Sequence, residues 1–217
     1  PPGARLGPLD SFTTSSAGGW GIDLGAMEGR LLLKNCSVLG PGGAVTRGQA
    51  VLVEGTQIAR VGPDLTIPAL PGDWVVPCAG RLLIPGLVDC HSQLLASARA
   101  RGTATPEEVA AISGHALALG LRFGVTTHFD QLHAPGAVQA ALGAQGQIAQ
   151  RLGARLIQSH ASSSAAELEA NAAAIRESKA PLVRGSIGLC SSSRCDDDCL
   201  TRAGRLREEL GCGVQLQ

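Results

Sequence analysis

Aromatic side chains are scarce in this sequence, and tyrosine is absent. Three Phe and two Trp are its only large aromatic rings among 217 residues, so Leu, Val, Ile and Ala must fill the core. Hydrophobic residues still make up 44% of the chain, which is enough for a sizeable interior. This composition is typical of helices packed on buried parallel strands.

An excess of charge of either sign is also missing. The 18 basic and 18 acidic residues cancel to a formal net charge of zero, so no strong field attracts the chain to nucleic acid or to an anionic membrane. No run reaches the roughly 18 apolar residues of a membrane span, and the first residues lack the basic and apolar regions of a signal peptide. We therefore expect a cytoplasmic protein that binds neither nucleic acid nor membrane.

The cysteines do not form a recognisable framework of disulfides or metal ligands. Their number is odd and they are spread along the chain, which indicates reduced thiols. Three of them surround an acidic triplet, but the spacing C-x₄-C-x₃-C does not match the paired C-x₂-C of zinc knuckles, and acidic residues also cap helix N-termini. The seven cysteines are Cys36, Cys78, Cys90, Cys190, Cys195, Cys199 and Cys212.

Composition and periodicity divide the chain into three parts. Residues 1–26 are rich in Gly, Pro, Ser and Thr without periodicity and predict a disordered leader; Met27, the only methionine, is a hypothetical natural start. Short strands separated by turn signals predict a small β-sandwich over residues 27–84. Residues 85–217 alternate between buried strands and helices, which predicts a parallel α/β sheet or barrel.

The alternation in the third part is regular enough to predict its elements. Short apolar runs indicate strands, and amphipathic stretches with capping residues indicate helices. The expected strands are residues 87–91, 124–129, 154–158, 183–189 and 213–216. The expected helices are residues 105–121, 134–152, 164–178 and 197–210.

The junction between the second and third parts carries a family resemblance. Residues 80–93 read GRLLIPGLVDCHSQ, and with the strands of residues 31–62 they resemble the amidohydrolase superfamily, most closely its aminohydrolase and chlorohydrolase branch with guanine and cytosine deaminase. The resemblance covers residues 30–217. It implies an α/β fold with a small N-terminal β-sandwich followed by a partial TIM-type barrel of about five strands, and hydrolysis of carbon–nitrogen bonds, other than peptide bonds, in small cyclic substrates.

The resemblance also implies a metal site at the end of the first barrel strand. Relatives carry PGLVDxHxH there, and two histidines two residues apart on a strand point to the same side and reach one Zn²⁺ or Fe²⁺. Such a metal lowers the pKa of a bound water so that it supplies hydroxide. Here the pair is His91 and Gln93. A glutamine amide oxygen binds these metals poorly, so His91 is either a remaining metal ligand or a hydrogen-bonded histidine.

The fifth strand shows the same replacement. Relatives have Val-His-x-His there, whereas this chain has Gln215 and Gln217. Zinc or iron is therefore the implied cofactor, bound weakly or not at all, and no residue is assigned as catalytic. Cys190 aligns loosely with a substrate-contacting histidine of relatives.

Other polar residues follow the second and third strands of the expected barrel. Asp130 and His133 lie after the second strand, in a position that borders the substrate pocket in relatives. A polar surface loop explains them equally well. His160, at the end of the third strand, faces the pocket side in the resemblance. The predicted substrate-binding residues are Asp130, His133, His160 and Cys190.

The remaining metal ligands and acid/base groups of the family would lie beyond Gln217. Five strands would also leave an open edge of unpaired backbone groups. We therefore expect an amidohydrolase-like hydrolase fold with impaired catalysis, a pseudoenzyme. Two alternatives remain: a non-catalytic binding or scaffold subunit whose open edge is covered by a partner chain or a second copy, and an incomplete isoform.

Overall fold

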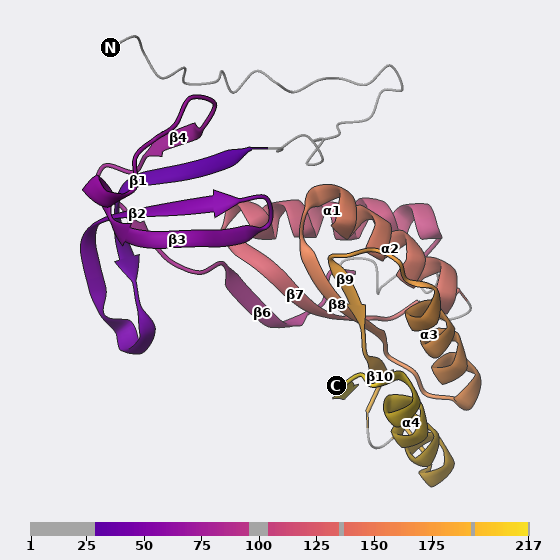
Figure 1. Cartoon of the computed structure of the whole chain (residues 1–217). Helices are drawn as coiled ribbons and strands as arrows, with labels where there is room; N and C mark the ends of the chain where they lie inside the picture. Colours follow the sequence, from indigo (N-terminus) through magenta and orange to yellow (C-terminus); the bar gives the residue numbers. More distant parts are fainter. Residues whose placement is uncertain (1–28, 96–103, 135–136, 192–193, 217) are drawn as a thin grey trace. The chain divides into compact units, whose positions relative to one another are not determined.

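A computed structural model describes residues 29–95, 104–134, 137–191 and 194–216 (Figure 1). The predicted leader, the proposed start at Met27 and the glutamine at position 217 lie outside these residues. The described chain forms two compact units that divide between Pro85 and Gly86. Each unit is described by itself.

The first unit is a five-stranded sheet with the strand order β3-β2-β1-β4, in which β5 also pairs with β1. The first three strands are antiparallel neighbours, whereas β4 and β5 run parallel to β1. Leu32, Ala50, Leu52 and Ile67 form its buried core. The described residues of this unit form one sheet, so the second layer of the predicted sandwich stays a prediction. The strands are β1 (Arg30–Leu39), β2 (Val45–Glu54), β3 (Gln57–Pro63), β4 (Trp74–Pro77) and β5 (Leu82–Leu83), with short 3-10 helices at Pro41–Gly43 and Asp64–Thr66.

The second unit has only parallel strand pairs. Four strands form a sheet in the order β6-β7-β8-β9, and two more form the pair β10-β11. The strands are β6 (Leu87–Ser92), β7 (Val125–Leu132), β8 (Arg155–His160), β9 (Val183–Gly185), β10 (Ile187–Leu189) and β11 (Val214–Leu216). The helices are α1 (Pro106–Arg122), α2 (Val138–Leu152), α3 (Ala165–Glu177) and α4 (Asp197–Leu210). The predicted alternation of strands and helices is therefore confirmed as a mixed α/β unit.

Side-chain caps explain where three of the helices begin. Thr105 and Glu108 form a reciprocal capping box at the start of α1. The side chain of Ser164 accepts a hydrogen bond from the Glu167 amide at the start of α3. Asp196 caps α4 by accepting from the Cys199 amide at 2.7 Å, so the acidic triplet serves a helix N-terminus, as predicted.

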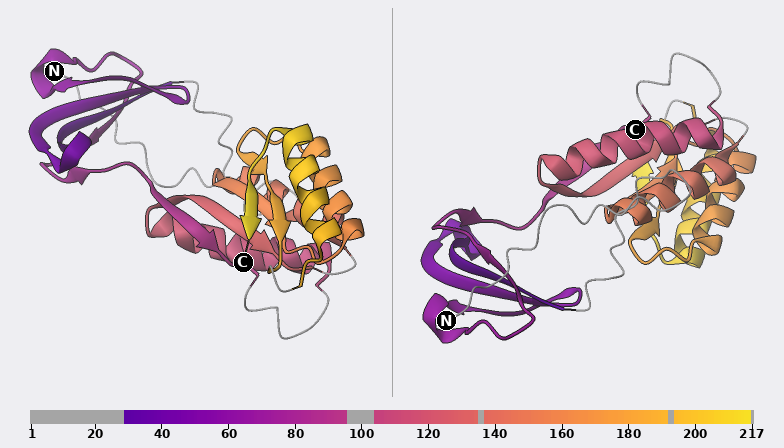
Figure 2. Two further views of the ribbon diagram at one scale, coloured as in Figure 1. Left: turned by 90° about the horizontal axis from the view of Figure 1, so that it is seen from below. Right: turned by 90° about the horizontal axis from the view of Figure 1, so that it is seen from above.

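The predicted fourth strand, residues 183–189, is split in two. Ser186 interrupts it and donates its backbone N–H to the Gln158 carbonyl at 2.9 Å. As a result β9 pairs with β8 whereas β10 pairs with β11. In Figure 2, α3 and α4 lie side by side next to β10 and β11.

The core of the second unit lies between the strands and the helices. Leu132 of β7 packs with Val109 of α1 and Leu142 of α2. Leu156 of β8 packs with Leu117 and Ala149. Side chains of the same parity on β7 and β8 therefore face the helices, and those of the other parity face the opposite side of the sheet. Among the described helices, none is long and apolar enough to cross a membrane.

A close backbone approach at Gly188 generates the first prediction. A Cβ atom added there would lie 2.1 Å from the carbonyl oxygen of His160, so the strands would have to separate. We expect Gly188→Ala to lower the free energy of unfolding by about 2 kcal/mol or more, measured by chemical denaturation of the whole chain.

Gly204, in α4, is the matched control for this substitution. No atom lies within 4 Å of a Cβ added there, so Gly204→Ala should be neutral or stabilise the helix by about 0.5–1 kcal/mol. Equal unfolding midpoints for the two alanine variants would contradict the close approach.

Candidate functional site

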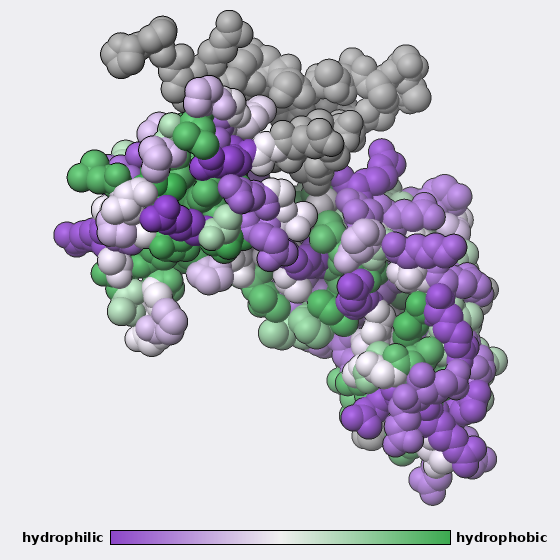
Figure 3. Space-filling model, viewed as in Figure 1, coloured by the Kyte–Doolittle hydropathy of each residue, from purple (hydrophilic) through white to green (hydrophobic). Residues whose placement is uncertain are grey.

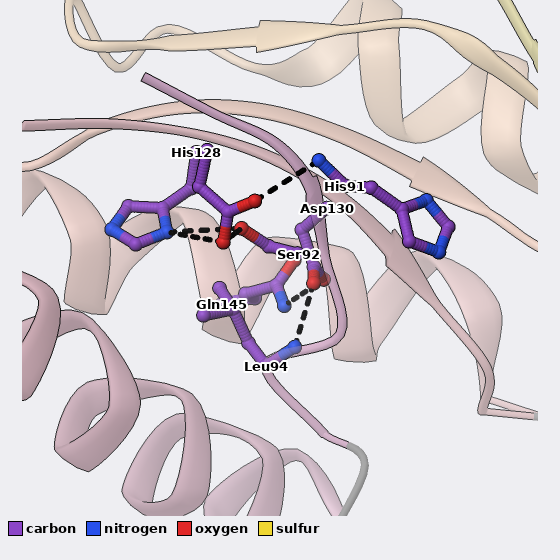
Figure 4. Close-up of polar contacts among 7 residues, drawn as sticks. His91, Ser92, Leu94, His128, Asp130 and Gln145 are labelled. Atoms are coloured by element: carbon purple, nitrogen blue, oxygen red, sulfur yellow. Dashed lines mark hydrogen bonds and ion pairs between the residues drawn. The ribbon is translucent and has the colours of Figure 1, made fainter. Parts of the chain in front are cut away.

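His91 and Gln93 lie at the end of β6, where the sequence predicts the metal pair. Their Nε2 atoms are 3.5 Å apart, so the two side chains share one side of the chain as predicted. His91 is exposed, and its backbone N–H donates to the Asp89 carboxylate at 3.1 Å. Its ring points away from His128 and Asp130 in Figure 4. The strand end thus presents one imidazole and one carboxamide together.

A serine, a histidine and an aspartate meet between β6 and β7 (Figure 4). The Ser92 hydroxyl donates to Asp89 Oδ2 at 2.7 Å, and its oxygen lies 3.0 Å from His128 Nδ1. Asp89 Oδ2 lies 3.9 Å from the same Nδ1 atom. A catalytic triad requires the serine and the aspartate on opposite ring nitrogens of the histidine. These three residues therefore connect β6 to β7 and do not form an activated nucleophile.

Burial and hydrogen bonding set the charge states of His128 and Asp89. Burial lowers the pKa of His128, although the nearby Asp89 carboxylate opposes the shift. The hydrogen bond from Ser92 is the main cause that lowers the pKa of Asp89. At neutral pH the His128 imidazole is therefore neutral and the Asp89 carboxylate is ionised.

Asp130 is fully buried on the helix-facing side of β7. One carboxylate oxygen accepts from the Leu94 amide at 2.7 Å, and the other accepts from Gln145 Nε2 of α2 at 2.7 Å. Gln145 Nε2 also lies 3.3 Å from the Ser113 hydroxyl of α1. The carboxylate thus connects β7 to the segment after β6 and to two helices. Its contact with a substrate stays a prediction.

His160, His133 and Cys190 are brought together around Ser162. His160 is fully buried, and its Nε2 accepts from the Ala134 amide at 3.2 Å while its Nδ1 lies 3.3 Å from the Ser162 hydroxyl. Its ring stacks on exposed His133 with centroids 6.1 Å apart. The Cys190 amide donates to the Ser162 carbonyl at 2.9 Å. Three of the four predicted substrate-binding residues therefore form one cluster, and Asp130 is held elsewhere on β7.

Ser159 and Gln215 form a cross-strand contact that the sequence analysis does not single out. The Ser159 hydroxyl of β8 donates to Gln215 Oε1 of β11 at 2.9 Å. Gln131 of β7 likewise donates from Nε2 to the Leu189 carbonyl of β10 at 2.9 Å. Gln215 thus connects β8 to β11 at the position predicted for a metal ligand, and Gln131 connects β7 to β10. Gln131 lies two residues after Phe129 along β7, and side chains two residues apart on a strand point to the same face. This spacing is the sequence signal that could have placed Gln131 on the same face as Phe129.

The residues that the structure describes do not fit a zinc or iron centre. Among the described residues, no three or more His, Cys, Asp or Glu side chains are grouped so that they could hold a metal ion. His91 is paired with an amide, and both ring nitrogens of His160 are engaged. All seven cysteines are thiols, and burial raises the pKa of Cys199 to about 11, which disfavours the thiolate that a metal requires.

The Asp130 network generates a stability prediction. Asp130→Ala leaves the buried Leu94 and Gln145 donors without their acceptor, so we expect a loss of about 3 kcal/mol in the free energy of unfolding. Asp198→Ala, on the exposed first turn of α4, is the matched control and should cost less than about 1 kcal/mol. Similar losses in urea denaturation would show that Asp130 does not hold these elements together.

The burial of His160 generates a pH prediction. Burial is the main cause that lowers its pKa from 6.5 to about 4, and nearby His133 adds to the shift whereas Glu167 opposes it. The unfolded chain therefore takes up a proton at this histidine at a higher pH than the folded chain does, and stability falls as the pH drops from 6.5 towards 4. We expect the free energy of unfolding to fall by about 2 kcal/mol between pH 7 and pH 5 from this residue.

The test compares His160→Gln with the unmodified chain in denaturant titrations at both pH values. Glutamine is neutral throughout and can still accept from Ala134, so the variant should lose most of this pH dependence. His115→Gln, on the exposed face of α1, is the control. An unchanged pH dependence in His160→Gln would contradict the assignment.

Sequence comparison finds short regions of similarity to amidohydrolases. No protein-family model matches the chain. The chain is 40% identical over 63 residues to an imidazolonepropionase of Acidiphilium cryptum, which covers 29% of this chain and 16% of that protein. It is 40% identical over 67 residues to a dihydroorotase of Mycobacterium tuberculosis, which covers 30% of this chain and 15% of that protein.

Solved structures match over most of the chain. A triazine hydrolase variant superimposes with a TM-score of 0.73 at 16% identity and covers 85% of this chain and 52% of its own. A zinc-bound adenosine deaminase from Xanthomonas campestris gives 0.68 at 20% identity, with 86% and 48% covered. An atrazine chlorohydrolase from Arthrobacter aurescens with zinc gives 0.70 at 16%, with 85% and 52% covered.

Because the sequence identities with these solved structures are low, the similarity to them concerns the fold alone. The chain spans about half the length of these structures and a smaller part of the curated relatives. Its structural neighbours are a triazine hydrolase variant, an adenosine deaminase and an atrazine chlorohydrolase. The resemblance indicated by residues 80–93 is therefore confirmed, and the chain shares the fold of these structures over part of their length.

Proposed function

We propose that this chain is an amidohydrolase-like protein, related to hydrolases of non-peptide carbon–nitrogen bonds, whose catalysis is impaired as the sequence stands. Its structural neighbours include an adenosine deaminase and a 5-methylcytosine deaminase, which supports this class of ancestry. The observation that carries the impairment is the pair of glutamines at the predicted ligand positions of β6 and β11. Gln93 lies beside His91, and Gln215 is bonded to Ser159.

Ligand chemistry supports this proposal. Zn²⁺ and Fe²⁺ prefer imidazole nitrogen, and the neutral amide oxygen of glutamine is a weaker donor. Gln215 also uses its oxygen in a strand-to-strand hydrogen bond, so a metal would have to displace Ser159. Gln215 thus acts as a cross-link between strands in the place of a metal ligand, and Gln93 places a carboxamide beside His91.

The same proposal extends to the domain organisation. Residues 27–84 would be the N-terminal part of a composite β-sandwich domain, after a leader of residues 1–26. Residues 85–217 would supply about five strands of a partial TIM-type barrel. The strict parallel pairing from β6 to β11, with a helix between most successive strands, supports this arrangement.

A second candidate function is that of a binding or scaffold subunit. Four apolar side chains on the outermost strands of the second unit, Leu87 and Val88 of β6 and Val214 and Leu216 of β11, are between 44% and 54% exposed. Exposed apolar edge strands favour pairing with a further strand. We propose that additional polypeptide covers them, whether from the same protein, from a second copy or from a partner chain.

Restoring the histidines tests the main proposal. Gln93→His together with Gln215→His should rebuild an imidazole set with His91, and we expect the variant to bind Zn²⁺ at least about tenfold more tightly than the unmodified chain, since imidazole replaces amide at two positions. Calorimetric titration with Zn²⁺ and metal analysis after dialysis measure the gain.

His91→Ala in the double variant is the control, because it should remove most of the gained affinity. A double variant that folds but binds no more Zn²⁺ than the unmodified chain would show that these positions do not face a common metal site.

A further inference from the structure

We propose that a pocket between α2 and α3, on the helix-facing side of the sheet, binds a small ligand with a cis amide group, such as a lactam, a cyclic ureide or a primary carboxamide. This site is separate from the ends of β6 and β11. It uses none of the residues on which the proposed function depends, so the two proposals stand or fall independently.

The pocket exists because small residues line the facing helices. Gly143 and Gly146 of α2 and Ala174 of α3 leave a cavity of about 360 Å³ above β8. Leu142 adds an apolar wall. A cavity of this size accommodates a small ring compound with its polar group directed inward.

Gln158 of β8 lines the pocket and supplies the recognition group. Its side chain is 95% buried, and among the described residues its Oε1 atom has no hydrogen-bond partner. A Cβ atom added to Gly146 would lie 3.5 Å from Gln158 Nε2 and 3.6 Å from Oε1, in ordinary van der Waals contact, so both amide atoms lie beside this glycine. A buried amide oxygen without a partner is unfavourable, and a ligand that donates to it removes that cost.

The chemistry of a carboxamide defines the class of ligand. Gln158 presents a donor and an acceptor side by side, and a cis amide presents the complementary acceptor and donor. The two groups can form a pair of antiparallel N–H···O hydrogen bonds. Leu142 and Ala174 then contact the aliphatic part of a ring, which favours lactams and cyclic ureides over open-chain amides.

Polar residues surround the mouth of the pocket. Gln139 of α2 donates from Nε2 to Glu177 Oε2 at 2.7 Å and so bridges the two helices there, while Lys179 lines the same mouth. Hydrophilic residues dominate the surface over α3 in Figure 3. The pocket therefore opens onto a polar surface, which suits a small water-soluble ligand.

The test compares 2-pyrrolidinone with N-methyl-2-pyrrolidinone, which has the same ring without the N–H donor. Nuclear magnetic resonance titration of the ¹⁵N-labelled chain follows the Gly143 and Gly146 amides and the Gln158 side-chain NH₂ signals. We expect saturable shifts with 2-pyrrolidinone and at least roughly tenfold weaker binding of the N-methyl compound, because one of the two hydrogen bonds is lost. Equal affinities, or no saturable shifts with 2-pyrrolidinone, would overturn the proposal.

Two variants locate the binding. Gly146→Ala places a methyl group in ordinary contact with the Gln158 amide, so it should abolish binding without unfolding the helix, whereas Gly204→Ala in α4 should leave binding unchanged. Gln158→Met keeps the side-chain volume but removes the amide. It should abolish binding and raise the thermal midpoint of the ligand-free chain by about 2–4 °C. Binding that survives in both Gly146→Ala and Gln158→Met would overturn the proposal.

Discussion

A buried carboxylate organises the second unit. The carboxyl oxygens of Asp130 need hydrogen-bond donors away from water, and they accept from the Leu94 backbone amide after β6 and from the Gln145 side-chain amide of α2. Gln145 extends the same network to Ser113 of α1. The register of β7 against its neighbours and the positions of two helices are therefore tied to one side chain. Because side chains alternate along a strand, holding Asp130 among the helices directs Gln131 to the opposite face.

Hydrophobic runs, turn residues and helix caps are local signals, and they predicted most elements of the second unit from the sequence alone. The sequence predicts the end of β7 too early, at residue 129, because the polar Asp130 and Gln131 interrupt the apolar run. Both are buried in the fold, where partners distant in sequence satisfy them. The break at Ser186 was missed for a similar reason, since it depends on the carbonyl of Gln158. Long-range hydrogen bonds of this kind leave no periodicity in the sequence.

Glutamine occupies two of the predicted metal-ligand positions of the site. The replacement of histidine by Gln93 and Gln215 could be read directly from the junction motif and the fifth strand. The hydrogen bond that Gln215 forms could not be predicted from the sequence, because its hydroxyl partner, Ser159, lies 56 residues away on β8. Likewise, His160 is identified by its place at a strand end, but the burial that lowers its pKa depends on tertiary packing, and its Nε2 partner, Ala134, lies 26 residues away in sequence. Local pattern locates a site, and tertiary contacts decide its chemistry.

The interruption at Ser186 has a consequence for how this chain folds and opens. β10 and β11 pair with each other, and their helix α4 packs on α3 through side chains such as Leu168 and Leu206. The segment from β10 to β11 is thus attached by an apolar interface, by hydrogen bonds around Ser162 and by side-chain hydrogen bonds from Gln131 and Ser159, rather than by a continuous ladder. We expect such a segment to behave as a separate foldon, which detaches and exchanges its amide hydrogens while β6 to β9 remain paired.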